Sequence, residues 1–169
     1  MGTAWENYRR RAGVLRQVLA RLDDTPGASV RWYDVPGVTE VFADREDLLR
    51  ELHRVWANRL AARVDLALES DHHELAHSVM RAWQEVAAEL PALRRVLDHH
   101  AGDPAIWYAT RREHRMLAVA AGLAILDDPE DHAVAEGVRL VNSVTLPAPR
   151  PHRARVFGRP LRLRPNPAA

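Results

Sequence analysis

The sequence lacks cysteine altogether, has few glycines and contains no long apolar run. Without cysteine in its 169 residues, the chain has no disulfide framework, no thiolate metal site and no cysteine nucleophile, so any metal site would depend on histidine and carboxylate ligands. The longest apolar stretch, Leu117–Leu126, has ten residues, whereas a membrane-spanning helix needs about 18 to 20. With 47% hydrophobic residues, 28% charged residues and only 8 Gly, the composition is that of a folded globular protein.

Charge and proline divide the chain at residue 147. Residues 1–146 hold 18 Arg and 23 acidic residues, a balance of −5, whereas residues 147–169 hold 6 Arg and no acid, a balance of +6. Six of the 11 Pro also lie in this last segment, which disfavours a packed helix there. Since one domain has about 150 residues, we predict a single helical domain, 1–146, followed by an irregular basic tail, 147–169.

The basic tail is a candidate binding segment. Its arginine side chains suit phosphates or an acidic protein surface, and Arg31 in the body is also suited to phosphate contact. The alternative is a solvated tail that keeps an acidic body in solution, because only one Phe lies among the tail arginines. The predicted residues for binding nucleic acid or an acidic partner are Arg31, Arg150, Arg153, Arg155, Arg159, Arg162 and Arg164.

Apolar residues at helical spacing predict an all-α fold. The first stripe runs from Trp5 and Tyr8 to Leu22 in alternating steps of three and four residues, the period of one helix face. The predicted helices cover residues 5–22, 44–69, 71–90, 91–101 and 105–126, with a further helix after Asp128-Pro129. The stretch 28–43 has no clear period, and because no second strand is there to pair with it, we expect one short helix in it rather than a strand.

Polar residues before the apolar stripes mark the helix starts. Side chains of Asp, Asn, Ser and Thr cap a helix by accepting a backbone N–H of its first turn. Glu74 stands three residues after Asp71, at capping-box spacing, and Asp103-Pro104 has the cap-then-proline order. The predicted N-cap residues are Thr3, Asp44, Asp71, Asp103 and Asp128.

Residues 36–49 read Pro-Gly-Val-Thr-Glu-Val-Phe-Ala-Asp-Arg-Glu-Asp-Leu-Leu and lead into a long amphipathic helix. This pattern resembles the tetracycline-repressor-like (TetR) regulators, in which a Gly-Val-Ser/Thr turn introduces the DNA recognition helix and an acidic-Leu-Leu run leads into the ligand-binding body. The segment 87–97, followed by Gly102-Asp-Pro-Ala, is similar to a phrase common in such bodies. The resemblance covers about residues 14–110 and implies a TetR-like helical bundle that binds DNA, takes a small effector and forms a dimer.

The chain departs from that family where the family reads DNA. Only three residues, 39–41, separate Gly37-Val38 from Phe42, and one of them is acidic. The family has a longer segment here, and a recognition helix needs about two turns and several donors aimed at base edges. We therefore interpret 1–43 as a degenerate helix-turn-helix region and 44–146 as the helical body, either of a regulator or of a derivative that has lost specific DNA reading.

Aromatic and histidine side chains of the body are candidates for an effector pocket. On the predicted helix 105–126, His114 and Trp107 share a line that faces inward, and in a TetR-like body the inward face is where an effector would bind. The alternative is that each candidate is a core residue, because buried histidines and tryptophans belong to a core more often than to a pocket wall. The predicted pocket residues are Trp56, Trp83, Trp107 and His114.

Residues 73–77, His-Glu-Leu-Ala-His, match the H-E-x-x-H pattern, in which two imidazoles one helical turn apart bind zinc and the glutamate activates a water. Under this hypothesis His73 and His77 are metal ligands and Glu74 is the base of a zinc hydrolase. The alternative is a capped, exposed helix start, because both histidines fall away from the apolar stripe of their helix. Candidates for a third ligand are Glu113 and His114.

The leading prediction is a TetR-like transcriptional regulator or a regulator derivative, without catalytic activity and without a cofactor. The first alternative is an adaptor that binds RNA or an acidic protein through its basic tail, and the second is the zinc hydrolase. The expected partners are DNA or RNA, a small apolar effector and a second copy of the chain. We expect no membrane association, and because the first residues lack the basic-then-apolar order of a targeting signal, we expect a cytoplasmic location.

Overall fold

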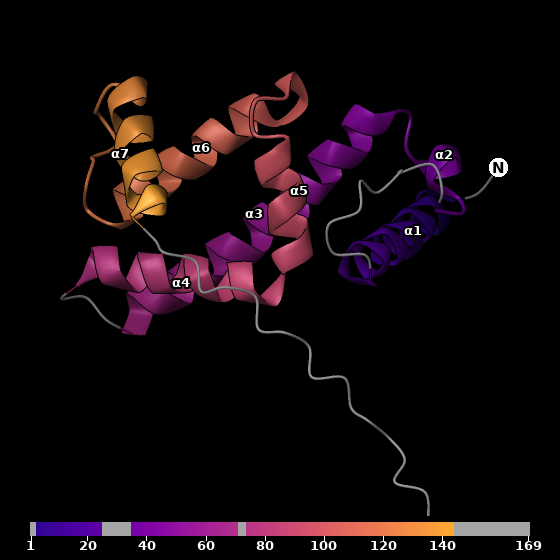
Figure 1. The fold of residues 1–169 in the computed structure, drawn as a ribbon, viewed down its shortest axis with the longest axis horizontal. Coiled ribbons are helices and arrows are strands. Elements are labelled where there is room, and N and C mark those ends of the chain that lie inside the picture. Colours follow the sequence, from indigo (N-terminus) through magenta and orange to yellow (C-terminus); the bar gives the residue numbers. More distant parts are fainter. Residues whose placement is uncertain (1–2, 25–34, 71–73, 144–169) are drawn as a thin grey trace, which may run out of the picture.

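Helices account for all regular structure in the part of the chain that the computed structural model describes, residues 3–24, 35–70 and 74–143. No strand occurs in these residues, which confirms the predicted all-α, single-domain fold. In chain order (Figure 1) the helices are α1 (Ala4–Asp24), α2 (Val38–Val41), α3 (Arg45–Ser70), α4 (Leu75–Glu89), α5 (Pro91–His99), α6 (Pro104–Ala120) and α7 (Glu130–Asn142).

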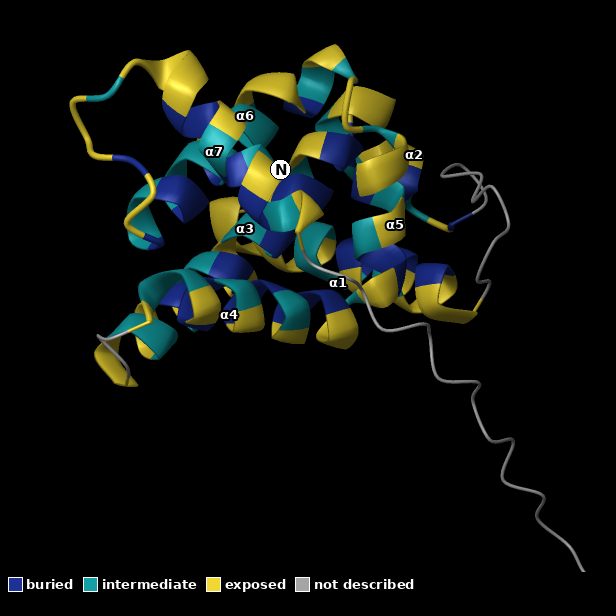
Figure 2. Ribbon diagram, turned by 60° about the vertical axis from the view of Figure 1, so that its left-hand side comes forward, coloured by how far each residue is buried: buried dark blue, intermediate teal, exposed yellow. Residues whose placement is uncertain are grey.

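The long helix α3 runs through the middle of the domain. Asp44 caps it as predicted, because its Oδ1 accepts the backbone N–H of Asp47 at 2.7 Å. The apolar stripe expected along this helix is buried from Leu48 to Val64, and Trp56 at its middle is fully enclosed. Helices α4, α5 and α6 all pack against α3. In Figure 2 the exposed residues of α4 lie on the side that faces away from α3, as the amphipathic pattern requires.

Helix α1 begins with the capping arrangement that Thr3 predicts. The Thr3 hydroxyl accepts the Glu6 N–H at 3.3 Å, and the Thr3 N–H donates to the Glu6 carboxylate at 2.7 Å. The apolar stripe is only half buried, however, since Trp5 and Tyr8 are 59% and 60% exposed. All buried residues of α1 lie between residues 14 and 22, so the first two turns project beyond α2 and α5, on which α1 packs.

Helix α4 begins later than the sequence predicts. Its first residue is Leu75, and Glu74 is the N-cap residue, with no capping hydrogen bond from its side chain. The predicted capping role of Glu74 is therefore wrong, and Asp71 lies outside the described residues. The break at Pro91 is confirmed, because α4 ends at Glu89 and Pro91 opens α5, where a missing N–H costs nothing.

The start of α6 is confirmed and its predicted end is wrong. Asp103 caps the helix, with its Oδ1 accepting the Ala105 N–H at 3.0 Å. The helix does not run to Leu126 but ends at Ala120.

A glycine ends α6. Gly122 has a φ of +70°, the left-handed conformation that favours glycine. With Gly122 in this position, its N–H donates to the carbonyl of Val119 at 3.0 Å and the Leu123 N–H donates to the carbonyl of Ala118 at 2.9 Å. These two bonds are the Schellman motif, which satisfies the last carbonyls of a helix and prevents its continuation.

Helix α7 crosses α6 at close range. Its N-cap residue is Pro129 rather than the predicted Asp128, whose side chain instead accepts the Ile125 N–H at 2.8 Å within the turn. At the crossing, Gly137 lies against the backbone of His114. None of the described helices is long and apolar enough to cross a membrane.

Candidate functional site

The segment that the TetR resemblance assigns to DNA reading contains a single helical turn, α2. Gly37 precedes it with a φ of +82°, and Val38 is buried. The side chains that α2 exposes are those of Thr39 and Glu40. One hydroxyl and one carboxylate cannot provide the array of donors that reads base edges in the major groove.

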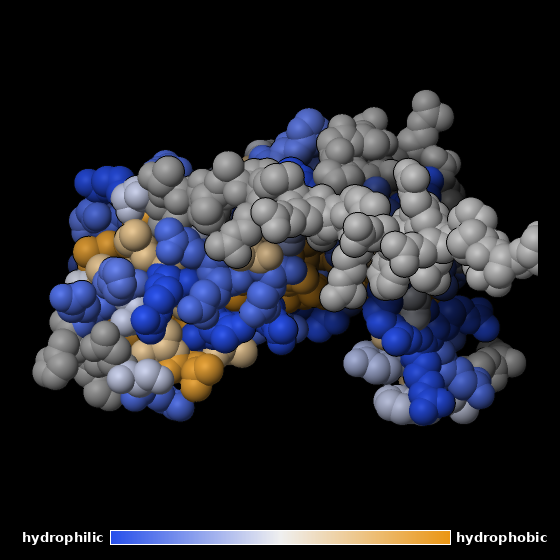
Figure 3. Space-filling view, turned by 60° about the horizontal axis from the view of Figure 1, so that its bottom comes forward, coloured by the Kyte–Doolittle hydropathy of each residue, from blue (hydrophilic) through white to orange (hydrophobic). Residues whose placement is uncertain are grey.

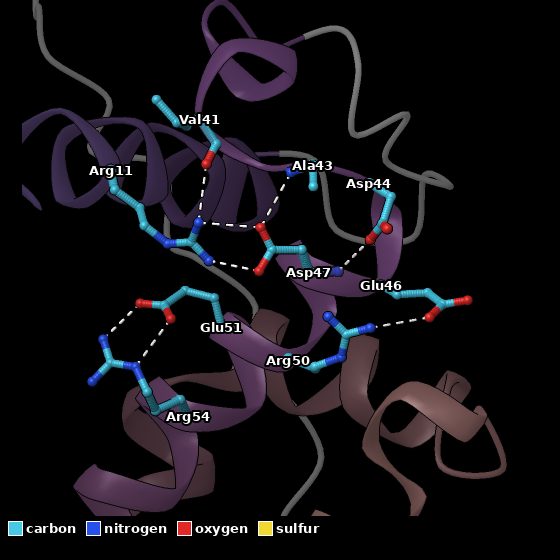
Figure 4. Close-up of polar contacts among 9 residues, drawn as sticks. All are labelled: Arg11, Val41, Ala43, Asp44, Glu46, Asp47, Arg50, Glu51 and Arg54. Atoms are coloured by element: carbon cyan, nitrogen blue, oxygen red, sulfur yellow. Dashed lines mark hydrogen bonds and ion pairs between the residues drawn. The ribbon is translucent and has the colours of Figure 1, made fainter. Parts of the chain in front are cut away.

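An ion pair between α1 and α3 holds α2 in place (Figure 4). The Arg11 guanidinium donates to both oxygens of Asp47, at 2.8 and 3.1 Å, and to the carbonyl of Val41 at 2.9 Å. Asp47 also accepts the Ala43 N–H at 3.2 Å. The ion pair therefore joins α1, the end of α2, the connection that follows α2, and the first turn of α3.

The charges of this junction stabilise each other. The hydrogen bond from Arg11 is the main reason that the pKa of Asp47 lies below its ordinary value, and the same bond raises the pKa of Arg11. The Arg11 guanidinium also lies 4.3 Å from the centre of the Phe42 ring. Arg11 is thus engaged in holding the helices together and is not a free cation on the surface.

The outer face of α1 carries arginines and exposed aromatic rings. Trp5 and Tyr8 stack with ring centres 5.7 Å apart, and the Arg9 guanidinium lies 5.0 Å from the Trp5 ring centre. Arg16, two turns further on, shares this outward face and is exposed. We call Trp5, Arg9 and Arg16 the α1 ridge. In Figure 3 α1 forms a largely hydrophilic lobe that stands apart from the rest of the surface shown.

The positive charge of the α1 ridge is not neutralised locally. No acidic residue occurs between Asn7 and Leu22 in the sequence. Neither Arg9 nor Arg16 has an acidic partner among the described residues. An uncompensated pair of guanidinium groups on an exposed helix attracts phosphates.

A second polar site lies inside the body, centred on Glu113 of α6. Its Oε1 accepts the Trp56 Nε1–H at 3.0 Å, and its Oε2 lies 3.3 Å from Nε2 of His53. The Arg94 guanidinium lies 3.6 Å from Glu113 Oε1, 4.7 Å from the Trp56 ring centre and 6.0 Å from the Trp83 ring centre. We call these five residues, His53, Trp56, Trp83, Arg94 and Glu113, the Glu113 cluster.

The surroundings of Glu113 keep its carboxyl group ionised. Burial by itself would raise the pKa of Glu113, but His53, Arg94 and the Trp56 N–H together hold the pKa below its ordinary value. His114, the next residue, is half-buried, and its burial lowers its pKa. The cluster therefore combines a buried anion with a cation at neutral pH.

The structure brings together only part of the predicted effector pocket. Trp56 and Trp83 are both buried and meet edge to face, with ring centres 6.0 Å apart. The predicted inward orientation of Trp107 is wrong, because this side chain is 42% exposed and packs on Tyr108 and Arg111. The inward side of α6 is lined by its neighbours instead, among them Ile106, Glu113 and Leu117.

Two cavities lie among the described residues, and both are small. One lies among residues of α4, α6 and α7 and has no room for a water molecule; its lining residues are Val79, Met80, Trp83, Leu117, Leu140 and Val141. The other, of about 140 Å³, lies beside α2 and the start of α3, next to Phe42 and Arg45. Neither approaches the roughly 300 Å³ of a typical small-molecule pocket.

The sequence analysis did not predict this buried cluster. It did not single out His53 or Arg94, and it named Glu113 only as a candidate zinc ligand. The available signal was a charged or polar residue on the apolar stripe of a helix. His53 follows Leu52 on α3, and Glu113 lies four residues before Leu117 on α6, at positions where a helix faces the core. A charge at such a position requires a buried partner, but the partner belongs to another helix and is not visible in the sequence.

Of the two H-E-x-x-H side chains that the structure describes, only that of His77 lies within a helix. Glu74 precedes α4, His77 lies exposed in its first turn, and His73 lies outside the described residues. Glu113, one candidate for a third ligand, is enclosed by the Glu113 cluster. Within residues 3–24, 35–70 and 74–143, no group of three histidine or carboxylate side chains could hold a metal ion.

The predicted arginines for nucleic-acid or partner binding, Arg31 and the six arginines of the tail, lie outside the described residues. Their assignment stays a prediction.

The chain was compared with known proteins at three levels. No family model, no curated protein and no solved structure matches it. The arrangement of the described residues is therefore the basis for assigning a function.

Proposed function

We propose that this chain is a TetR-like helical regulator derivative that binds nucleic acid through phosphate contacts from α1 and does not read base sequence through α2. The observation that carries the proposal is the contrast between these neighbouring helices. The four residues of α2 expose Thr39 and Glu40, whereas the α1 ridge exposes Arg9 and Arg16, which have no acidic partner in the described part of the chain. The proposed function is binding, not catalysis.

The order of the helices supports the regulator part of this proposal. A turn at Gly37 introduces a short helix, and the 26-residue α3 then leads into a body made of α4 to α7. This order corresponds to the turn, recognition helix, connecting helix and body that the TetR resemblance implies. The Arg11–Asp47 pair gives the first three helices a defined arrangement, as a nucleic-acid-binding unit needs.

A salt series of nucleic-acid binding tests the proposal. The full chain is titrated into two fluorescent DNA duplexes of about 25 base pairs with unrelated sequences, at several salt concentrations. We expect equal affinity for both duplexes and a steep loss of affinity with salt. Each phosphate contact contributes about 0.9 to the slope of log K against log salt, so R9A/R16A should reduce the slope by about 1.8.

A matched control variant separates the α1 ridge from general charge. Arg95 and Arg112 are also exposed and have no acidic partner among the described residues. R95A/R112A removes the same charge as R9A/R16A from other faces, so it should leave the slope nearly unchanged. A strong preference for one duplex, equal losses in both double variants, or no binding at low salt would contradict the proposal.

The same assay tests the adaptor alternative. In the full chain, the six arginines of residues 147–169 are replaced by glutamine. If this variant loses binding to DNA and RNA while R9A/R16A keeps it, the basic tail is the binding element and the α1 ridge is not.

A further inference from the structure

The Glu113 cluster has the composition of a site for an organic cation. The Glu113 side chain is 5% exposed and accepts the indole N–H of Trp56, and Trp56 in turn meets Trp83 at an interplanar angle of 76°. A carboxylate supplies the counter-charge for a cation, and indole faces attract cations more strongly than other aromatic rings do. A buried carboxylate beside two tryptophans therefore favours a positively charged group between them.

The chain's own Arg94 fills that position. Its guanidinium lies over Trp56 and within 6.0 Å of the Trp83 ring centre. Its contact with Glu113 is loose, however, since the nearest nitrogen is 3.6 Å from Oε1, beyond a good hydrogen bond.

The firm bonds of Arg94 point to the surface. Its Nε and NH2 atoms lie 2.9 and 2.7 Å from Oδ1 of Asp98, one turn further along α5. The Asp98 side chain is 57% exposed, whereas that of Arg94 is 11% exposed. If the guanidinium leaves Glu113, it keeps the charge partner that binds it most closely, so Arg94 is a displaceable occupant rather than a fixed one.

The cluster is also incomplete as a purely structural network. Nε1 of Trp83 is buried without a hydrogen bond in the described structure, and Nε2 of His53, although 3.3 Å from Glu113, lacks the geometry of one. Buried polar atoms are nearly always paired in folded proteins, because an unpaired one loses its bonds to water without replacement. Two such atoms within one buried cluster leave hydrogen-bonding capacity for a further group.

We propose that the Glu113 cluster is a binding site for a planar organic cation of the guanidinium or amidinium class, and that such a ligand displaces Arg94 from Glu113. The cation pairs with the Glu113 carboxylate and takes the space over Trp56 that the Arg94 guanidinium fills, while Arg94 turns outward with the exposed Asp98. This inference goes beyond the proposed function and does not depend on nucleic-acid binding.

Isothermal titration calorimetry on the full chain tests the site, with benzamidine as the cationic probe and benzamide as its neutral counterpart of similar shape. We expect saturable one-to-one binding of benzamidine, at least tenfold tighter than that of benzamide. Arg94→Met removes the competing cation but keeps the length of the side chain, so it should tighten benzamidine binding at least tenfold. Glu113→Gln should weaken it at least tenfold.

Two further variants guard against indirect effects. Arg59→Met removes another arginine that pairs with a carboxylate, Glu89, on the surface, and it should leave the affinity unchanged. If Glu113→Gln does not fold, as judged by circular dichroism, Trp83→Phe provides the same test through a weaker aromatic face and should reduce affinity several-fold. The proposal is overturned if wild-type protein binds no benzamidine, if benzamide binds equally well, or if Arg94→Met binds no more tightly than wild type.

Discussion

Gly137 of α7 lies directly against the main chain of His114 in α6. A Cβ atom at residue 137 would stand 1.9 Å from the His114 carbonyl oxygen and 2.5 Å from its carbonyl carbon. Such distances are far inside van der Waals contact, so only glycine allows the two helices to cross this closely. The crossing holds α7 on the body, where α6 and α7 pack along each other.

We expect Gly137→Ala to destabilise the protein by about 3 kcal/mol, because the added methyl group meets backbone atoms that cannot move independently of α6. Urea unfolding followed by circular dichroism measures this change. The matched control is Gly13→Ala, since Gly13 is also inside a helix but a methyl group added there would meet no atom within 4 Å beyond its own helix backbone and chain neighbours. At that position, higher helix propensity should stabilise the protein by about 0.5–1 kcal/mol. Equal effects of the two substitutions would contradict the close crossing.

The Arg11–Asp47 pair should contribute measurable stability, because both side chains are half-buried and the contact has two hydrogen bonds. In a double-mutant cycle with Arg11→Met and Asp47→Asn, we expect a coupling free energy of about 1–2 kcal/mol, after allowance for partial solvent screening. The comparison cycle uses the exposed pair of Arg50 and Glu46 on α3, whose side chains are 53% and 55% exposed and for which about 0.5 kcal/mol or less is expected. Similar coupling in both cycles would count against a special role of the Arg11 junction.

The same pair makes stability depend on pH in a defined direction. Because Arg11 lowers the pKa of Asp47 below its ordinary value of 3.8, the folded state binds a proton there less readily than the unfolded state does. The stabilisation is therefore complete above about pH 5 and is lost as pH falls below 3.8 and through the lower pKa of the folded state. The stability difference between wild type and Asp47→Asn should shrink between about pH 5 and pH 2, and a difference that stays constant over this range would contradict the assignment.

Helix starts were predictable from the sequence where the capping bond is local. Thr3, Asp44 and Asp103 each cap a helix in the structure through an atom two or three residues away. A contact of this kind depends on the residues next to one another in the chain, so the residue types suffice to predict it. The start of α4 at Leu75 differs because the side chain of Glu74 makes no such bond.

Burial was less predictable, because it depends on which elements meet. Trp5 and Tyr8 continue the apolar period of α1, yet they are exposed since no described helix covers that end. Trp107 stands at helical spacing from residues of α6 that were expected to face inward. The buried side of α6 instead contains Ile106, Glu113 and Leu117, and α6 packs on α3. Periodicity shows which residues share one face of a helix, but it does not show how much of that face another helix covers.

The sequence by itself determined the all-α class, most helix starts and the shortness of the segment between Gly37 and Phe42, because these follow from local spacing and capping. Only the tertiary structure decided that Arg11 clamps α2, that Gly137 sets the crossing of α6 and α7, and that Glu113 meets Trp56, His53 and Arg94. These contacts join residues 19 to 60 positions apart in the chain, and they form because burying a charge or a backbone carbonyl requires a partner that packing alone can supply.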